Sequence, residues 1–554
     1  MRSRILVGLL LLVSLTVLVG FAQEAVDPNE DGNCTMIVVG KDASVDGSVM
    51  TTHTCDGNYD PRLFVIPGGK FEPGKTVTIV KNQLHADYQQ VVPLGEIPQV
   101  AETHTYFLIG YPFMNEHQIM MGEHTFGGRK EYRAAADSGA MFYIEQLQAI
   151  GLQRGKTARE VIQIMGDLAD QYGYADGGEC ISVCDPNEGW VFEIVGPGAL
   201  WKAGSGEPGA VWAAKRVPDN AVYAGANRSL IGELNLANPH YYMAGKGIFS
   251  VGEKYGFWDP KGTKPFRYWD VYGYKADNFY NTRREWRVRD FFAPSLALDP
   301  WARRYPFSVV PDKKISVADL MTIQRDSYAG TPFDLTKGLA AGPYGTPDRW
   351  PTSSSLQPKD TTGWERAIAM FRCSYTIATQ SRAWLPDPIG GVLWFGEDNP
   401  ATTTYVPIYC GVTDVPLSLK TLSRAQFSRE SAWWAFAFVE NWSNLGYSAM
   451  IKDINAQQKA LEGEFLAMQP AIEAAALAMY AVDSALAVKF LTNYTADVVN
   501  RTVATQWMLA DTLVSKYNDG ANRTYPQEWL TAVGFCDTTK IADFKDIWYG
   551  EYQP

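Results

Sequence analysis

A β-branched run that begins directly after Cys34 is the feature that most constrains the fold of this chain. Residues 35–39 are mostly apolar and β-branched, Asp46 and Gly47 form a turn signal, and residues 48–54 are a second strand candidate. Two such runs separated by a turn predict an antiparallel pair of strands. Cys34 would stand at the start of that pair.

The residues before Cys34 are typical of an export leader followed by a short polar segment. Arg2 and Arg4 precede an apolar run over residues 5–19, and small residues at the −3 and −1 positions favour cleavage after Ala22. The run is shorter than the roughly 20 residues that a membrane-spanning helix needs, and no later segment resembles a span. We therefore expect a signal peptide over residues 1–22, a pro-segment over residues 23–33, a secreted or periplasmic product, and no stable membrane insertion after signal removal.

Charge and cysteine content exclude several classes of protein. The net charge of −12 argues against nucleic acid or an anionic membrane as a partner, because those partners require a basic face. Export would permit disulfides, and the seven cysteines leave at least one thiol unpaired within a monomer. Cys180 and Cys184 fall in one strand-like stretch, where their spacing is too long for an easy bridge. No CxxC pair occurs, so the sequence predicts no structural zinc site, no redox motif and no cofactor.

The region up to about residue 235 mixes strand and helix patterns, which predicts an α+β fold. One helical stretch is expected over residues 134–150 and continues over residues 158–172. The expected strands cover residues 76–80, 106–109, 119–121, 190–195 and 221–226.

The second half of the chain changes character twice. Residues 236–360 are rich in Pro, Gly, Trp and Tyr with weak periodicity, which predicts long loops and short helices. Residues 375–379, 391–395 and 403–408 predict further strands. From residue 431 to about 517 apolar residues recur at helical spacing, with Pro470 marking an expected break. These residues predict a long helical hairpin packed on the rest of the chain, with a partner-binding coiled coil as the alternative.

The segment around Cys34 resembles a known family. It reads NCTMIVVGKDASVDGSVMTTHTCDGNYDPR and is similar to the start of the mature chain in dipeptidase A-type cysteine peptidases, which belong to the N-terminal nucleophile hydrolase superfamily. Later blocks resemble the same family in the same order, so the likeness spans roughly residues 34–454. These blocks read DPNEGWVFEIVGPG, VWAAKRVPDNAVYAGANRSLIGEL, the strand block of residues 389–409 and SAWWAFAFVENWSNLGYSAMIKDI.

The resemblance implies a fold and a division into domains. It implies a four-layer αββα sandwich of the N-terminal nucleophile hydrolase type with a C-terminal helical hairpin. The catalytic αββα domain, with long loop insertions, would cover residues 34–430. The C-terminal helical region, packed on the catalytic body, would cover residues 431–554.

The resemblance also assigns Cys34 as the nucleophile, exposed as a new N-terminus. The α-amine of a terminal cysteine has a pKa of roughly 7.7–8.0, so it can take the thiol proton directly or through one water. No separate histidine base is then needed. The thiolate would attack an amide carbonyl, and water would release the acyl-enzyme. The bond between Asn33 and Cys34 permits self-cleavage, and another protease is the alternative.

Three more residues are assigned a catalytic role by the family pattern. Asn227 matches the position whose side-chain amide is expected to point at the oxyanion, and Asp56 matches the position expected to hold the α-amine. Each has an alternative reading as a turn residue. His53 departs from the pattern, because many relatives carry Arg there, and a core histidine is its alternative reading.

Two residues are assigned to substrate binding. Family analogy places one of Glu123, His124 and Thr125 near the substrate, and Thr125 is our choice. Arg228 is a candidate for a substrate carboxylate, with an exposed structural arginine as the alternative. His117 and His124 do not form an HExxH motif, so we expect no metal at these histidines.

The leading hypothesis is therefore an exported, self-processing cysteine dipeptidase that acts on small peptides, namely dipeptides. One alternative is an acylase of the penicillin V or bile-salt type, which cleaves non-peptide amides. Another is an exported binding protein that kept the scaffold but lost activity. Side-chain preference and oligomeric state are not predicted by the sequence.

Overall fold

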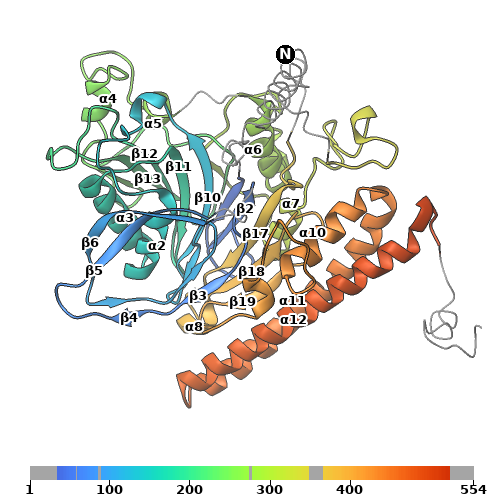
Figure 1. Ribbon diagram of the computed structural model, residues 1–554. Helices are drawn as coiled ribbons and strands as arrows, with labels where there is room; N and C mark the ends of the chain where they lie inside the picture. Colours follow the sequence, from blue (N-terminus) through green and yellow to red (C-terminus); the bar gives the residue numbers. More distant parts are fainter. Residues whose placement is uncertain (1–33, 58, 85–88, 274–277, 349–365, 524–554) are drawn as a thin grey trace, which may run out of the picture.

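The computed structural model describes residues 34–57, 59–84, 89–273, 278–348 and 366–523 (Figure 1). The expected leader and pro-segment and the seventh cysteine, Cys536, lie outside these residues. Two large antiparallel sheets, two small two-stranded sheets, the surrounding helices and a long helical hairpin make up the described chain.

The first sheet has seven strands and begins with the pair predicted around Cys34. β1 pairs antiparallel with β2, and Val38 lies opposite Thr51, so this prediction is confirmed. The strand order is β16-β14-β1-β2-β17-β18-β19. The bounds are β1 Met36–Val39, β2 Met50–Asp56, β14 Val222–Gly225, β16 Ser308–Val309, β17 Cys373–Gln380, β18 Val392–Glu397 and β19 Val406–Tyr409.

The second sheet has eight strands in the order β15-β13-β12-β11-β10-β9-β8-β3. Its bounds are β3 Phe64–Ile66, β8 Tyr106–Leu108, β9 Met114–Asn115, β10 Met120–Gly127, β11 Gly178–Cys184, β12 Gly189–Val195, β13 Val211–Val217 and β15 Tyr242–Ala244. Two small sheets pair β4 Gly69–Lys70 with β7 Glu102–Thr103, and β5 Thr76–Leu84 with β6 Gln89–Pro98. Each strand predicted in this half of the chain overlaps an observed one.

The two sheets pack against each other through β1 and β2 on one side and β10, β11 and β12 on the other. Helices α2 (Ile144–Arg154) and α3 (Ala158–Tyr172) contact the eight-stranded sheet (Figure 1). Helices α6 (Phe279–Phe292) and α7 (Val317–Gln324) contact the seven-stranded sheet. The predicted α+β class is confirmed. The remaining short elements are α4 Ser250–Lys254, α5 Tyr268–Val271, α8 Asp387–Gly390, α9 Leu417–Lys420, α10 Ala432–Ser443, and the 3-10 helices η1 Lys130–Tyr132, η2 Pro294–Leu296, η3 Leu339–Ala341 and η4 Asn518–Gly520.

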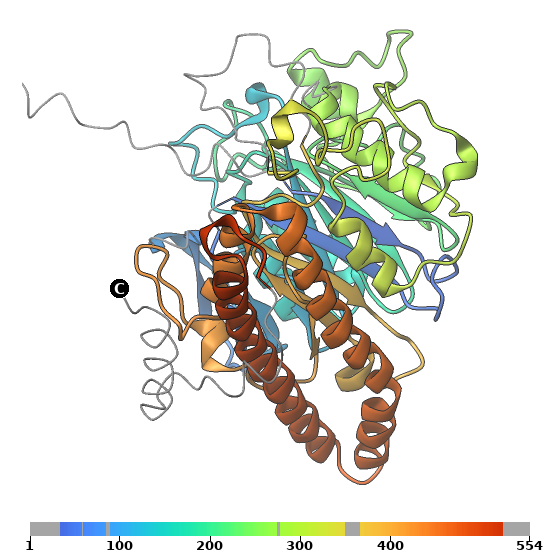
Figure 2. The same cartoon turned by 90° about the vertical axis from the view of Figure 1, so that its right-hand side faces the viewer.

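The predicted helical hairpin is formed by α11 (Tyr447–Tyr480) and α12 (Ser484–Lys516), which run side by side (Figure 2). Both helices contact β19, and Arg382 Nη1 lies 2.7 Å from Glu473 Oε1 of α11. The expected break at Pro470 is wrong, because α11 continues through it. Proline inside a helix costs roughly 3 kcal/mol, and packing of α11 along α12 and the sheet offsets that cost.

The predicted helix over residues 134–150 is wrong in its first half, since α2 begins only at Ile144. Ser138 N donates to Ala135 O in a turn, and Gly139 has a φ of 78°, a left-handed conformation that ends any helix. In contrast, α3 starts where predicted because Thr157 and Glu160 form a capping box. The strand expected from residue 403 begins at Val406.

The cysteines and the helices bear on two further predictions. None of the six cysteines among the described residues forms a disulfide, and Cys180 and Cys184 lie apart on β11 as expected. None of the described helices is both long and apolar enough to cross a membrane.

Gly122 on β10 marks a close approach of the two sheets. A methyl group added there would collide with the backbone oxygen of Thr52 on β2 and would lie 3.1 Å from Ser182 Oγ. Glycine is therefore required at this position by contact between the sheets.

We expect Gly122→Ala to lower the free energy of unfolding by about 1–3 kcal/mol, because a backbone oxygen cannot yield to the added carbon. Urea denaturation measures the change. Gly463→Ala is the matched control, since this exposed glycine of α11 has no atom within 4 Å of an added carbon and should gain up to about 1 kcal/mol. Equal stability of the two variants would contradict the account of sheet packing.

Candidate active site

Cys34 lies directly before β1 and is 1% exposed. Thr54 N donates to Thr35 O at 3.1 Å, and the β1–β2 register, continued by one residue, sets Cys34 opposite Cys55. Burial raises the pKa of the Cys34 thiol well above its usual value, and contacts with Cys55 and Glu123 raise it further. The thiol therefore stays protonated at neutral pH until a neighbouring base removes its proton.

A buried contact between a histidine and a carboxylate joins the two sheets beside this thiol. His53 Nε2 of β2 lies 3.2 Å from Glu123 Oε2 of β10, and both side chains are at most 1% exposed. Burial acts to raise the pKa of Glu123, but the hydrogen bond and charge of His53 outweigh burial and lower it. Glu123 is thus ionised at neutral pH. The rings of Tyr111 and Tyr375 pack edge-on around His53, with centroids 5.7 and 5.6 Å away.

Glu123 has two further polar neighbours, the hydroxyl of Thr125 and the carboxyl group of Glu179. Thr125 Oγ1 donates to Glu123 Oε1 at 3.1 Å, and Glu179 of β11 pairs with Thr125 across the strands. Burial raises the pKa of Glu179 well above its usual value, and the charge of Glu123 adds to this. Glu179 therefore holds a proton where Glu123 holds a charge. Perturbed carboxyl groups of this kind are typical of functional sites.

His124 follows Glu123 along β10 but stays uncharged. Burial lowers the pKa of His124 to about 3, and its Nε2 lies 3.4 Å from Tyr223 Oη. Gly225 of β14 makes room for the ring, since an added methyl group there would collide with His124 Nε2. The imidazole of His124 is thus a neutral side chain packed between β10 and β14.

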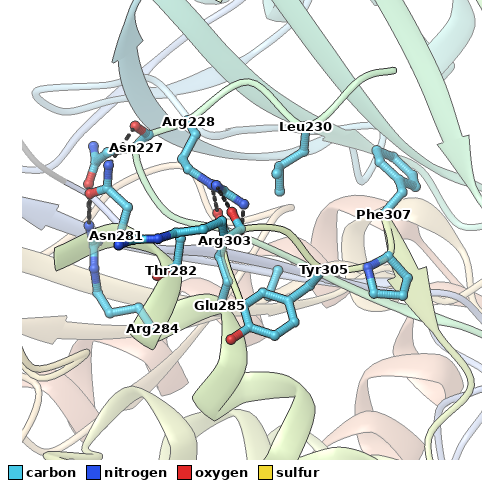
Figure 3. Close-up of polar contacts among 12 residues, drawn as sticks. Asn227, Arg228, Leu230, Asn281, Thr282, Arg284, Glu285, Arg303, Tyr305 and Phe307 are labelled. Carbon is cyan, nitrogen blue, oxygen red and sulfur yellow. Dashed lines mark hydrogen bonds and ion pairs between the residues drawn. The ribbon is translucent and has the colours of Figure 1, made fainter. Parts of the chain in front are cut away.

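Asn227 and Arg284 connect Cys34 to helix α6 (Figure 3). Arg284 Nη1 donates to Cys34 O at 2.8 Å and to Thr35 Oγ1 at 2.9 Å, and its Nη2 donates to Asn227 Oδ1 at 2.7 Å. Asn227 Nδ2 donates to Thr125 O at 2.8 Å. Asn227 has a φ of 56°, a left-handed conformation that asparagine tolerates better than most residues. These bonds fix the orientation of the Asn227 side-chain amide, with Oδ1 toward Arg284 and Nδ2 toward Thr125 O.

Asp56, at the end of β2, forms a fully buried ion pair with Arg366. Arg366 Nη1 also donates to Asn227 Oδ1 at 3.3 Å. Burial lowers the pKa of Arg366 to about 9, and the nearby Cys34 acts in the opposite direction. Arg366 therefore ties Asp56 to the same asparagine that Arg284 holds.

Arg228 is placed differently from the other predicted residues (Figure 3). Its Nε and Nη2 each donate at 2.8 Å to a carboxylate oxygen of Glu285, and its Nη1 donates to Arg303 O at 2.6 Å. The side chain is 2% exposed. This bidentate pairing joins the segment that follows β14 to α6 and shows a structural contact rather than an exposed arginine. The role of Arg228 toward a substrate carboxylate gains no support from this placement.

One continuous set of contacts thus joins five of the six predicted residues, Cys34, His53, Asp56, Thr125 and Asn227. The prediction did not include Arg284, Arg366 and Glu179, and it left Glu123 without a role. The run NTRREWRVRD over residues 281–290 was the available signal, because six charged residues of α6 lie among aromatic residues. The donor atoms of Cys34, His53 and Glu123 lie within 4.8 Å of one another. His53 and Glu123 already contact each other directly. The three residues are therefore placed so that His53 and Glu123 can set the charge next to the Cys34 thiol.

The comparisons with known proteins agree with this chemistry. A family profile described as peptidase family C69 matches residues 33–460. The chain therefore belongs to peptidase family C69. The predicted family is confirmed, as is the prediction of a hydrolase of the cysteine dipeptidase class.

Relatives cover most of this chain at low identity. A "Probable dipeptidase" of Latilactobacillus sakei is 25% identical over 426 residues, which cover 72% of this chain and 79% of the relative. A "Dipeptidase" of Bifidobacterium longum is 26% identical over 440 residues, or 73% of this chain and 75% of the relative. A "Probable dipeptidase A" of Streptococcus pyogenes serotype M18 is 24% identical over 466 residues, or 81% and 90%.

Arg284→Lys should lower kcat/KM for peptide hydrolysis by about 10²-fold. Lysine keeps the charge, but one ammonium group cannot hold Cys34 O and Asn227 Oδ1 together, and small misplacements of reacting groups carry costs of this size. Steady-state kinetics and a thermal melt of the same preparation measure the effect. Arg501→Lys on α12, whose exposed side chain pairs with Glu464, should leave the rate unchanged. A wild-type rate in Arg284→Lys would remove Arg284 from the site.

Proposed function

We propose that this chain is an exported cysteine dipeptidase that uses Cys34 as an N-terminal nucleophile on a four-layer αββα sandwich. The observation that carries the proposal is the buried Cys34 at the start of β1, surrounded by the His53–Glu123 pair and the Arg284–Asn227 contacts. Membership of peptidase family C69 and the dipeptidase names of the relatives support the substrate class. The sheets and helices described above are consistent with the sandwich.

The raised pKa of the Cys34 thiol explains why the proposal needs a free α-amine. In the 554-residue chain the nitrogen of Cys34 belongs to a peptide bond with Asn33 and cannot act as a base. Cleavage of that bond creates an amine with a pKa of roughly 7.7–8.0 beside the thiol. This amine takes the thiol proton, and the thiolate attacks the peptide carbonyl. The amine returns the proton to the leaving amino group, and water then hydrolyses the thioester.

Asn227 is the proposed donor to the oxyanion that forms during attack. Its Nδ2 carries two hydrogens, and the bond to Thr125 O uses one of them, so the second is the one assigned to the oxyanion. Arg284 and Arg366 both donate to Asn227 Oδ1 and so keep the amide in this orientation. A donor fixed before the reaction stabilises the developing charge without reorganisation.

His53 and Asp56 hold the charges around the nucleophile in this proposal. His53 stands where the family pattern that the sequence resembles has Arg. Its buried partner is Glu123, so the pair adds no net charge when His53 is protonated. Asp56 is proposed to hold the new α-amine, and its carboxylate pairs with the buried guanidinium of Arg366. Thr125 is proposed to contact the bound peptide through the segment that also binds Asn227.

Export and processing rest on the sequence. Residues 1–22 are the proposed signal peptide and residues 23–33 the proposed pro-segment, and both lie outside the described residues. Residues 34–430 are the proposed catalytic domain and residues 431–554 the proposed C-terminal helical region. Small peptides are the proposed substrates.

A panel of dipeptides and acyl amides tests the proposed substrate class. We expect turnover of dipeptides and little turnover of penicillin V or conjugated bile salts. Cys34→Ala should lower dipeptide turnover by about 10⁴-fold or more, as loss of a nucleophile does in other hydrolases. Cys184→Ala, which removes another buried thiol of the core, should keep the activity.

Two outcomes would contradict the proposal. Preferred hydrolysis of the acyl amides would favour an acylase over a dipeptidase. Dipeptide turnover by Cys34→Ala at the wild-type rate would remove Cys34 from the chemistry altogether.

A further inference from the structure

Two histidines and two carboxylates meet at a place that the proposed reaction does not use. His104 lies between β7 and β8, and Glu116 and His117 lie in the turn between β9 and β10. Backbone contacts hold this turn in place: Thr105 N donates to Glu116 Oε1 at 2.9 Å, and His117 N donates to Asn115 Oδ1 at 2.9 Å. The three side chains therefore converge from two separate loops of the eight-stranded sheet.

Asp387 fixes the protonation pattern of His117. Its Oδ2 lies 3.0 Å from His117 Nδ1, and an ionised carboxylate only accepts hydrogen bonds, so Nδ1 carries the hydrogen. In the neutral imidazole, Nε2 of His117 then carries a lone pair. That lone pair faces His104 Nδ1 at 3.3 Å.

The separation of these two nitrogens fits a tetrahedral metal ion. Zinc binds imidazole nitrogen at about 2.0–2.1 Å, and a tetrahedral angle then places two ligand nitrogens about 3.3–3.4 Å apart. A hydrogen bond between the rings could give the same distance. Glu116 Oε1 also lies 3.8 Å from His104 Nδ1, and the three ligand atoms are within 4.8 Å of one another, so a carboxylate is within reach of the same ion.

We propose, against the sequence-based expectation that His117 binds no metal, that His104, Glu116 and His117 bind one divalent transition-metal ion, zinc by preference. Two imidazoles and one carboxylate are a ligand set that zinc takes with a fourth position open to water. Asp387 does not bind the ion but supports the ligand His117. A carboxylate hydrogen-bonded to the second nitrogen of a ligating histidine orients the ring and strengthens it as a ligand. Glu116 and Asp387 are exposed at 39% and 46%, so an ion can enter from solvent.

The position of the site gives the ion a bracing role. Glu116 and His117 precede β10 of the eight-stranded sheet, whereas Asp387 begins α8, which leads into β18 of the seven-stranded sheet. Gln118 Nε2 donates to Asp387 Oδ1 at 3.1 Å and already links the two segments. A bound ion would strengthen this link. Such an ion would raise stability without entering the Cys34 chemistry.

Zinc titration of the full-length chain tests the proposal. The Cys34→Ala variant is the background, because it removes the thiol of the Cys34, His53 and Glu123 set. After treatment with a chelator and dialysis, calorimetric titration with ZnCl₂ should show one ion per chain and a rise in melting temperature. His104→Gln and His117→Gln should each weaken binding by about 100-fold or more, and Asp387→Asn by about 10–100-fold. His240→Gln, which changes an exposed histidine elsewhere, should bind as the background does.

Cobalt gives a second readout that locates the ion. Co²⁺ added to the chain with its native Cys34 should show the absorption of a tetrahedral nitrogen and oxygen site and no thiolate charge-transfer band. The proposal is overturned if the histidine variants bind zinc as tightly as the background, or if the cobalt spectrum shows a thiolate that Cys34→Ala abolishes. Asp387→Asn keeps all three ligands, so its affinity decides the matter if a histidine variant fails to fold.

Discussion

The guanidinium of Arg284 is the interaction on which the geometry of the site depends. It lies fully buried and donates to Cys34 O, Thr35 Oγ1, Asn227 Oδ1 and Asn281 Oδ1. A buried cation is costly unless its donors are satisfied, and here polar partners surround it. The start of β1, the end of β14 and helix α6 are thereby fixed relative to one another. Each residue proposed to act on the substrate is held directly or through one neighbour by this contact.

Burial, more than any single partner, determines which groups around the thiol are charged. Burial keeps the thiol of Cys34 and the carboxyl of Glu179 protonated, and it keeps His124 neutral. Glu123 is the exception, because His53 offsets the cost of its charge. The result is a buried region in which the Cys34 thiol keeps its proton, so that a proton acceptor placed beside Cys34 would have a large effect. The α-amine of a processed chain is such an acceptor.

The sequence predicted the fold well where local pattern and tertiary structure agree. The β-branched run before Gly40 forms β1, and the capping box of Thr157 and Glu160 starts α3 as expected. The prediction from sequence was wrong at two places where the local pattern did not decide the structure. Pro470 lies inside a continuous helix because packing outweighs the lost hydrogen bond, and residues before Ile144 form turns because Gly139 takes a left-handed conformation.

The site residues that could be predicted are those that lie in short blocks of the family pattern. Cys34 and Asp56 fall in the first block of the family pattern, and Asn227 in a later one. Arg284 and Arg366 were not found, because an arginine looks like a surface residue until the fold buries it. Arg228 shows the same limit, since the alternative of an exposed arginine does not describe its buried pair with Glu285.

The central claim is that Cys34 becomes the first residue of the working enzyme. N-terminal sequencing and intact-mass measurement of active, exported protein test it most directly. The account predicts a mature chain that begins with Cys34 and continues Thr35-Met36-Ile37. A fully active chain that still begins near Gln23 would contradict it, because the nitrogen of Cys34 would then be an amide and could not serve as the base.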